Sequence, residues 1–446
     1  MHGRRSWSAR LFGPPPSPEP SILPDAKRAP DGAGVPARRA ALRLLDAVLR
    51  KGLPLESALD AAARDLDKAE DRGLVHAIAA ETLRRLPDLD ALIDSATKKR
   101  LPDDAKARFA LRIALVQALA LGTPPHAAIA TALPLIDGGP RKLVHGVFGT
   151  LMRQGAALPD PPTLPDLVAV RWAHAWGEEV AAAAARLIAA PPPLDLSFPA
   201  DRPPALEGAS LLPGHLRLAA GTGVAGLAGY GEGEWWVQDI AASLPARLLG
   251  AGAGRSALDL CAAPGGKTMQ LAAAGFAVTA VDASESRLAR LADNLARTHL
   301  SAQVVTADVM AWAPPEPVDA ILLDAPCSAT GIYRRHPDVL HRVRPRAIAE
   351  LSAGQAAMLA RAADWLKPGG SLVYSVCSLE REEGERVAEA FLAARSDYAP
   401  EPISADEIGG IAQPVDGHLR LLPGTLEAEG GADGFFIARF RRISGG

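Results

Sequence analysis

Two cysteines in the C-terminal half of the chain each stand at the end of a short apolar run. Cys327 belongs to the sequence Asp324-Ala-Pro-Cys-Ser328, and Cys377 belongs to the sequence Tyr374-Ser-Val-Cys-Ser378. If these runs are neighbouring strands of a parallel sheet, ~4.8 Å apart, both thiols lie at its carboxyl edge, where ligands bind. A lone cysteine is most often a small buried hydrophobe. Two cysteines beside a ligand crevice favour nucleophilic chemistry instead.

Methylation of a pyrimidine at C5 is a reaction that needs a thiol in such a place. C5 is a poor nucleophile until a thiolate adds to C6, and loss of the C5 proton later expels the thiol. A carboxyl group near N3 assists by protonating or hydrogen-bonding the ring, and Asp324 is suitably placed in sequence for that task. The target base must be unpaired or flipped to reach the pocket. The chemistry leaves open which thiol adds to C6.

A glycine-rich turn follows the predicted strand 256–260 and precedes a predicted helix. Such a turn lets the backbone approach a ligand and points helix N–H groups at it. Asp282, 16 residues after Gly266, and Asp308 end the next two predicted strands, where acids suit the ribose and the adenine of S-adenosylmethionine. The residues of the turn are Cys261, Ala262, Ala263, Pro264, Gly265, Gly266 and Lys267.

A phosphate-binding P-loop is the alternative interpretation of this turn. Gly266, Lys267 and Thr268 fit its G-x-x-x-x-G-K-[ST] pattern, but Cys261 stands where the first glycine is required. A side chain there crowds the loop that wraps the phosphates. The pattern therefore favours a nucleoside ligand without phosphates.

Proline content and hydrophobic periodicity divide the chain into four predicted regions. Residues 1–36 hold eight prolines and indicate a disordered tail. Residues 37–158 show helical spacing without strand signals, and residues 159–233 form a proline-rich linker and a small α/β module. Residues 234–446 alternate strand and helix, which predicts an α/β, doubly wound, Rossmann-like parallel sheet. Asp239 is the expected N-cap of a helix over 240–249.

The composition limits the classes of function. The 48 Lys+Arg and 51 Asp+Glu residues give a net charge of −3, so overall charge does not indicate nucleic-acid binding. No apolar run approaches the ~18 residues of a membrane-spanning helix, so no membrane partner is expected. Three cysteines without a C-x-x-C pair indicate no disulfide scaffold and no metal site. They favour a reducing compartment, which we expect to be the cytoplasm.

One basic patch follows Cys327. Between residues 334 and 346 the chain has five arginines and a single acid, a balance that suits an RNA phosphate backbone. A solvated helix face is an equally good explanation of the patch taken alone. The arginines are Arg334, Arg335, Arg342, Arg344 and Arg346.

Taken together, these motifs resemble the Nop/Sun family of RNA cytosine-C5 methyltransferases. The matching segments are 259–268, 324–331, 334–338 and 374–378, flanked by Trp236-Val-Gln-Asp239 and Asp433-Gly-Phe-Phe436. The helical region resembles a NusB-like RNA-binding domain through segments 111–117 and 125–128. This arrangement is similar to that of the bacterial Fmu/Sun-type enzymes, which methylate small-subunit ribosomal RNA.

The resemblance implies roles for particular residues. S-adenosylmethionine is the implied cofactor, with the turn 261–267 at its methionine part, Asp282 at the ribose and Asp308 at the adenine. Asp324 would lie between cofactor and base. The family pattern makes Cys377 the nucleophile and gives Cys327 a part in product release. RNA is the expected partner, and small-subunit (16S) rRNA is the expected RNA. No protein partner is inferred, and we expect a monomer.

The chain departs from the family pattern at three places. Val376 stands where the family usually has Thr, segment 144–148 reads V-H-G-V-F instead of V-N-A-V-L, and residues 194–220 lack the usual L-R-V-N signature. Two alternatives remain open from the sequence: a C5 methyltransferase acting on tRNA or another RNA, and a non-catalytic RNA-binding or ribosome-assembly factor. Retention of Asp324 and both motif cysteines argues against the second.

Overall fold

The structure is a computed structural model that describes residues 32–443. Two compact units make up this part of the chain. The helical unit comprises residues 32–190 and 333–343, and the sheet unit comprises residues 191–332 and 344–443. Residues 1–31 of the predicted tail lie outside the described residues. The first described helix already begins at Val35, two positions before the predicted domain start.

The helical unit contains no strand among its described residues, as the periodicity predicts. Helix α6 lies at its centre, and every side chain from Ala107 to Gln117 is buried, because apolar residues occupy all sides of the helix. The helices of the unit are α2 (Val35–Leu49), α3 (Leu55–Ala62), α4 (Ala69–Arg84), α5 (Leu86–Ser95), α6 (Lys106–Leu119), α7 (Pro125–Ala132), η1 (Leu133–Leu135), α8 (Pro140–Arg153), α9 (Asp166–Trp176), α10 (Glu178–Ile188) and α14 (Val339–Arg342).

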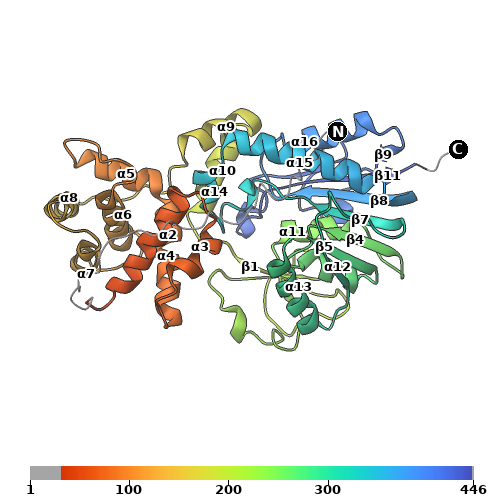
Figure 1. Ribbon diagram of the computed structural model, residues 1–446, viewed down its shortest axis with the longest axis horizontal. Helices are drawn as coiled ribbons and strands as arrows, with labels where there is room; N and C mark the ends of the chain where they lie inside the picture. The colour runs from red at the N-terminus through yellow and green to blue at the C-terminus, as the bar shows by residue number, and fades with distance from the viewer. Residues whose placement is uncertain (1–31, 444–446) are drawn as a thin grey trace, which may run out of the picture. The chain divides into compact units, whose positions relative to one another are not determined.

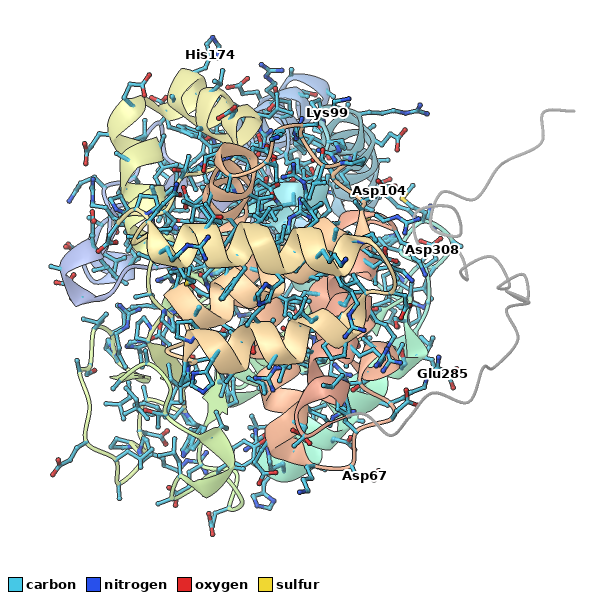
Figure 2. All side chains as sticks on the ribbon, turned by 90° about the vertical axis from the view of Figure 1, so that its left-hand side faces the viewer. Asp67, Lys99, Asp104, His174, Glu285 and Asp308 are labelled. Carbon is cyan, nitrogen blue, oxygen red and sulfur yellow. The ribbon has the colours of Figure 1, made fainter. Side chains whose placement is uncertain are left out.

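Two buried arginines of α6 are held by acids of α5. Arg112 forms two hydrogen bonds of 2.8 Å to the carboxylate of Asp90, and Arg108 pairs with Asp90 and Asp94. These bidentate contacts offset the desolvation of the guanidinium groups. The loop between α5 and α6 carries the labelled Lys99 and Asp104 of Figure 2, both exposed to solvent.

Residues 333–343 come from the C-terminal part of the sequence but pack in the helical unit. The Asp338 carboxylate accepts a hydrogen bond of 3.4 Å from the backbone N–H of Leu55, at the start of α3. His341 Nε2 lies 2.7 Å from the carbonyl oxygen of Leu83, and the ring of Tyr333 lies 5.4 Å from that of Trp172. This segment therefore contributes to the core of the helical unit.

The sheet unit contains an eight-stranded sheet of order β10-β11-β8-β7-β4-β5-β6, with β9 paired to β11. The strands from β8 to β6 in this order are parallel, which confirms the predicted doubly wound α/β sheet. Strands β9, β10 and β11 add an antiparallel edge that the sequence analysis did not predict. The strand bounds are β4 (Ser256–Leu260), β5 (Ala277–Asp282), β6 (Gln303–Thr306), β7 (Val318–Asp324), β8 (Leu366–Val376), β9 (Tyr398–Pro400), β10 (Leu419–Leu421) and β11 (Phe435–Arg442).

Helices cover both faces of this sheet, α11, α12 and α13 on one face and α15 and α16 on the other (Figure 1). Alternate residues of each strand serve the two layers: Leu323 packs toward α15 and α16, and Leu322 packs toward α11 and α12. The helices of the unit are α11 (Ile240–Arg247), α12 (Gly266–Ala273), α13 (Glu285–Thr298), α15 (Pro345–Ala363) and α16 (Glu385–Ala394), with short 3-10 turns η2 (Val224–Gly226), η3 (Thr330–Ile332), η4 (Asp406–Ile408) and η5 (Glu427–Glu429).

A small antiparallel sheet precedes the large one. Its strands β1 (Leu194–Ser197), β2 (His215–Leu218) and β3 (Trp236–Val237) are ordered β2-β1-β3. Strands β1 and β2 fall within residues 159–233, where the sequence indicates a small α/β module, and β3 lies beyond that range. The predicted division at residues 159–233 does not match the compact units, because α9 and α10 pack with the helical unit and the chain divides after Ala190.

The carboxylate of Asp195 joins the small sheet to helix α11. It accepts two hydrogen bonds of 2.7 and 2.8 Å from Arg217 and one of 3.0 Å from the backbone N–H of Ile240, the first residue of α11. Burial acts to raise the pKa of Asp195, but Arg217 and His215 outweigh it and hold the pKa well below its usual range. Asp239 caps the same helix by accepting from Ala241, as predicted.

We expect Asp195→Ala to lower the free energy of unfolding by about 3–5 kcal/mol, because it leaves the buried Arg217 without its partner. Since the folded pKa of Asp195 is depressed, its stabilisation is present above the usual carboxyl pKa of about 4 and is lost as the pH falls below it. Urea unfolding at several pH values measures both effects. The control Asp201→Ala, whose side chain is 80% exposed, should change the stability by less than about 0.5 kcal/mol. Equal losses in the two variants would contradict the assignment.

Candidate active site

The glycine-rich turn between β4 and α12 has a backbone that only certain residues tolerate. Gly265 has φ +105°, and a Cβ atom there would lie 2.9 Å from the Leu291 side chain. Cys261 also takes a left-handed conformation, with φ +62°. The turn bends so that the first N–H groups of α12, from Gly266 onward, begin at the carboxyl edge of the sheet.

A cavity of about 330 Å³ lies against this turn. Predicted cofactor residues that line it are Cys261, Ala262, Ala263, Pro264, Gly266, Lys267 and Asp324. Gly265, Asp282 and Asp308 are not among the lining residues. An added Cβ at Gly266 would reach 3.4 Å from the Gln238 side chain, so the glycine leaves space at the wall that these two residues share.

The two predicted acids beyond the turn lie in different surroundings. The carboxylate of Asp282 is buried and accepts hydrogen bonds of 3.1 Å from the Ala263 N–H and 2.9 Å from the Ser284 N–H. The Asp282 carboxylate therefore fixes the backbone of the turn without lining the cavity. Asp308 lies two residues beyond the end of β6, half-exposed, and Figure 2 shows it at the periphery, on the same side as Glu285. Their roles at the ribose and the adenine stay predictions.

The cavity also has walls that the sequence analysis did not assign to the site. Trp236 donates from Nε1 to the side-chain oxygen of Gln238 at 2.8 Å. The guanidinium group of Arg297, on α13, lies 4.3 Å from the centre of the Tyr230 ring. Asn294 of α13 lines the same wall. Of these wall residues, only those in the segment Trp236-Val-Gln-Asp239 could be picked out from the sequence, because that segment matches a family motif before the large sheet.

An ion pair between Lys267 and Asp324 forms part of the cavity wall. Lys267 Nζ lies 2.7 Å from Asp324 Oδ2, and Asp324 Oδ1 accepts a hydrogen bond of 2.8 Å from the Ser375 hydroxyl. Burial acts to lower the pKa of Lys267, but the charges of Asp324 and Asp259 outweigh it and raise the pKa. Burial raises the pKa of Asp259 to about 7. Since a carboxylate already holds Lys267, the P-loop interpretation loses the group that would bind phosphate.

The two motif thiols lie next to each other, as their positions after neighbouring strands predict. Cys327 Sγ and Cys377 Sγ are 3.4 Å apart. Strands β7 and β8 pair in parallel, with Asp324 opposite Ser375, and the Gly331 N–H donates to the Cys377 carbonyl oxygen at 3.0 Å. The hydrogen bond with Cys377, together with burial, raises the pKa of Cys327. The protonated thiol form of Cys327 is therefore favoured.

The five arginines of the predicted basic patch belong to two different units. Arg334, Arg335 and Arg342 lie in the helical unit, and Arg344 and Arg346 lie in the sheet unit. Arg334 is only 1% exposed, so its side chain is not presented to solvent and the expectation of a five-residue surface patch is corrected. Packing of segment 333–343 into the helical unit is the cause.

The remaining arginines of the patch differ in exposure. Arg335 and Arg342 are half-buried, and Arg342 donates to the buried Asp338 carboxylate at 2.8 Å. Arg344 is exposed, and Arg346 is exposed while paired with Glu350 at 2.8 Å. Binding of RNA by these four residues stays a prediction.

Solved structures share the fold of this chain. The protein PH0851 superposes with a TM-score of 0.70 at 22% identity, over 92% of this chain and 99% of that chain. NSun6 from Pyrococcus horikoshii, solved with SFG, gives a TM-score of 0.53 at 20% identity, over 63% of this chain and 99% of its own. At these identities the likeness is evidence of the fold alone.

Family comparisons define the class of protein. A model described as 16S rRNA methyltransferase RsmB/F matches residues 246–441, so the sheet unit is a methyltransferase that uses S-adenosylmethionine. A NusB family model matches residues 35–148, within the helical unit. The chain as a whole belongs to the RsmB/F family of 16S rRNA methyltransferases and is an RNA cytosine-C5 methyltransferase.

Two relatives illustrate the extent of the match. Ribosomal RNA small subunit methyltransferase B of Xylella fastidiosa is 35% identical over 429 residues, covering 91% of this chain and 98% of that protein. The protein of the same name from Klebsiella pneumoniae is 33% identical over 440 residues, covering 90% and 97%. Both helical and sheet units therefore have counterparts in these enzymes.

Two kinds of feature are absent from residues 32–443. This part of the chain has no cluster of three or more His, Cys, Asp or Glu side chains arranged to hold a metal ion. None of its helices combines the length and the apolar character needed to span a bilayer.

We expect Asp282→Ala to weaken S-adenosylmethionine binding by on the order of 10–100-fold, because the Ala263 N–H loses its charged acceptor and the turn loosens. Isothermal titration calorimetry measures this affinity directly. The matched control Glu285→Ala removes an exposed acid near the same strand end and should leave the affinity within about twofold of the wild-type value. ATP binding without S-adenosylmethionine binding would contradict the cofactor assignment.

Proposed function

We propose that this chain methylates C5 of a cytosine in small-subunit ribosomal RNA, with Cys377 as the nucleophile, Cys327 assisting product release and Asp324 facing the base. The observation that carries the proposed thiol chemistry is the 3.4 Å separation of the two sulfur atoms, beside a carboxylate that lines the cavity. The family pattern supports the assignment of Cys377 as nucleophile.

The proposed reaction begins when the Cys377 thiolate adds to C6 of the cytosine, forming a C–S bond and leaving C5 electron-rich. Asp324 lies on the chain between the cavity and the Cys327 loop, where its carboxyl group hydrogen-bonds the ring as charge develops. S-adenosylmethionine, held by residues 261–267, supplies the electrophilic methyl group that C5 takes. Removal of the C5 proton then returns the electron pair to the ring and breaks the C6–S bond.

The position of Cys327 supports a part in the last step. Its sulfur lies against the Cys377 sulfur, and its raised pKa favours the protonated thiol in the resting enzyme. A thiol poised there can donate its proton to the departing Cys377 sulfur and, as the thiolate that results, accept the proton removed from C5. Both uses keep Cys327 out of the bond-forming step.

RNA delivery is proposed for the helical unit together with the exposed Arg344 and Arg346. The match to the NusB family over residues 35–148 supports the role of the helical unit. The exposure of the Arg344 and Arg346 side chains supports their contact with RNA phosphates. We propose that the enzyme acts in the cytoplasm, since Cys327 and Cys377 have to stay reduced for this chemistry.

Single substitutions of the two thiols should have opposite outcomes. We expect Cys377→Ala to abolish methyl transfer and to form no covalent complex with RNA, because no sulfur adds to C6. Cys327→Ala should add to the base and transfer the methyl group, and then stall before release. The stalled species is a denaturant-resistant protein–RNA adduct, visible as a shifted band on a denaturing gel.

The control for this experiment is Cys261→Ala, which removes the third cysteine. Because Cys261 lines the cavity at the cofactor turn, we expect weaker cofactor binding in this variant, but no adduct should accumulate, since both motif thiols are kept. An adduct that forms with Cys377→Ala and is absent with Cys327→Ala would reverse the roles. Bisulfite sequencing of small-subunit rRNA from a deletion strain identifies the modified cytosine. Methylation restricted to tRNA would contradict the proposed substrate.

Replacing Arg344 and Arg346 with Gln should weaken RNA binding and flatten its salt dependence, by up to about one unit of log–log slope for each phosphate that is no longer neutralised. The affinity for S-adenosylmethionine should not change. Filter binding of a small-subunit rRNA transcript over a series of KCl concentrations measures the slope. The control Lys367→Gln with Arg386→Gln removes two exposed cations that already pair with acids, and should keep the wild-type slope. An unchanged slope in both variants would assign Arg344 and Arg346 to an ordinary solvated surface.

A further inference from the structure

Glu383 belongs to the loop 377–384 that joins β8 to α16 and carries Cys377, and its side chain is fully buried. One carboxyl oxygen accepts hydrogen bonds from the Ser328 N–H at 2.8 Å and from Gln355 Nε2 at 3.1 Å. The other oxygen is hydrogen-bonded to the hydroxyl groups of Ser328 and Ser378. A single carboxyl group therefore receives contacts from both loops.

The two serines have a particular place in the sequence. Ser328 directly follows Cys327, and Ser378 directly follows Cys377. Because each serine is one peptide unit from a thiol residue, a group that fixes both serines also fixes the backbone that carries the two sulfur atoms. The two loops also contact each other directly: the two serine hydroxyls lie 3.1 Å apart, and the Thr330 hydroxyl accepts a hydrogen bond of 3.0 Å from the Leu379 N–H. Glu383 adds to these contacts a carboxyl group that is hydrogen-bonded to both serine hydroxyls.

The Glu383 backbone is itself tightly held. The Tyr374 hydroxyl donates to the Glu383 carbonyl oxygen, and a Cβ atom added at the next residue, Gly384, would come within 2.8 Å of the Phe436 ring. Tyr374 and Phe436 both belong to the core layer under the thiols. The carboxyl group therefore has little freedom to follow a loop that moves.

Burial of this carboxyl group is costly and needs an explanation. Within residues 32–443 no basic side chain pairs with Glu383, and its hydrogen bonds come from two hydroxyl groups, one backbone N–H and one side-chain amide. Burial raises the pKa of Glu383, although the donors act against this shift. An apolar side chain would avoid the desolvation cost but would leave the buried polar groups of Ser328, Ser378 and Gln355 without this acceptor.

We propose that Glu383 is a positioning residue that holds the Cys327 and Cys377 sulfur atoms at their working separation. The proposal rests on the proposed roles of these thiols and adds the group that sets their geometry. Glu383 touches neither substrate nor cofactor in the proposed reaction and acts through Ser328 and Ser378. The charge of Glu383 also contributes to the raised pKa of Cys327.

The oxidation of the thiols measures their separation without RNA or cofactor. Diamide removes one hydrogen atom from each thiol, the two sulfur atoms form a bond of ~2.05 Å, and diamide is reduced to the corresponding hydrazine. The rate depends on how often the sulfur atoms, 3.4 Å apart, approach to bonding distance. Mass spectrometry of the Cys327–Cys377 peptide pair follows the reaction, and Cys261 serves as an internal unreacted thiol.

Three variants test the proposal. Glu383→Ala removes the acceptor, and we expect slower disulfide formation and a fall in kcat on the order of 100-fold, the effect expected for a misplacement of about 1 Å. Glu383→Gln keeps the shape but offers a single acceptor oxygen, so an intermediate fall of about 10-fold is expected. Glu382→Gln, a matched change one residue earlier on a partly exposed side chain, should behave as the wild type.

The outcomes separate this proposal from the proposed function. S-adenosylmethionine affinity and KM for RNA should stay within about twofold in all three variants, because the cavity does not include Glu383. If Glu383→Ala does not fold, Glu383→Gln decides: wild-type oxidation rate and wild-type kcat in that variant would overturn the positioning role. If the wild-type enzyme methylates no RNA, the proposed function fails, while the oxidation rates still decide whether Glu383 positions the thiols.

Discussion

The parallel pairing of β7 with β8 is the interaction on which the geometry of the site depends. Its register sets Asp324 opposite Ser375, so the loops that follow the two strands begin at the same level of the sheet. The adjacent pair, Leu323 and Tyr374, is buried in one core layer, and the pair before it is buried in the other. A slip of one residue would exchange these layers, so the burial of both faces fixes the register. Sulfur atoms 50 residues apart in sequence thereby become neighbours.

Polar groups at this edge of the sheet form two hydrogen-bonded clusters, one at the cavity and one beside the thiols. Lys267 holds Asp324, Asp324 accepts from Ser375, and Glu383 receives donors from the loops on either side. Each of these charges has at least one charged or hydrogen-bonding partner, which is the condition for keeping such groups away from water. The site is consequently preorganised: its donors and acceptors already have fixed directions before substrate arrives.

The reactive residues at the strand ends could be predicted from the sequence. The buried residues that hold them in place could not. Cys327 and Cys377 follow apolar runs, and the carboxyl ends of parallel strands share an edge, so local patterns were sufficient to bring them together. Glu383 stands in a run of three acids within four residues, a composition typical of solvated surface. Only packing with distant residues buries it while Glu382 stays partly exposed. Arg334 is the same case with opposite charge: a basic run predicts a surface, and a non-local contact buries the side chain.

Because residues 333–343 belong to the helical unit, the described chain from residue 32 to residue 443 passes from one unit to the other three times, after residues 190, 332 and 343. The two units are therefore interleaved in sequence and are not successive modules that a single cut would separate. A protein ending at residue 190 would lack Tyr333 and Val339, both buried in the helical unit, and would expose the apolar surfaces that they cover. An exchange of the N-terminal region between relatives would also have to exchange residues 333–343, because these residues pack in the helical unit. The sequences of the two units are therefore constrained to change together.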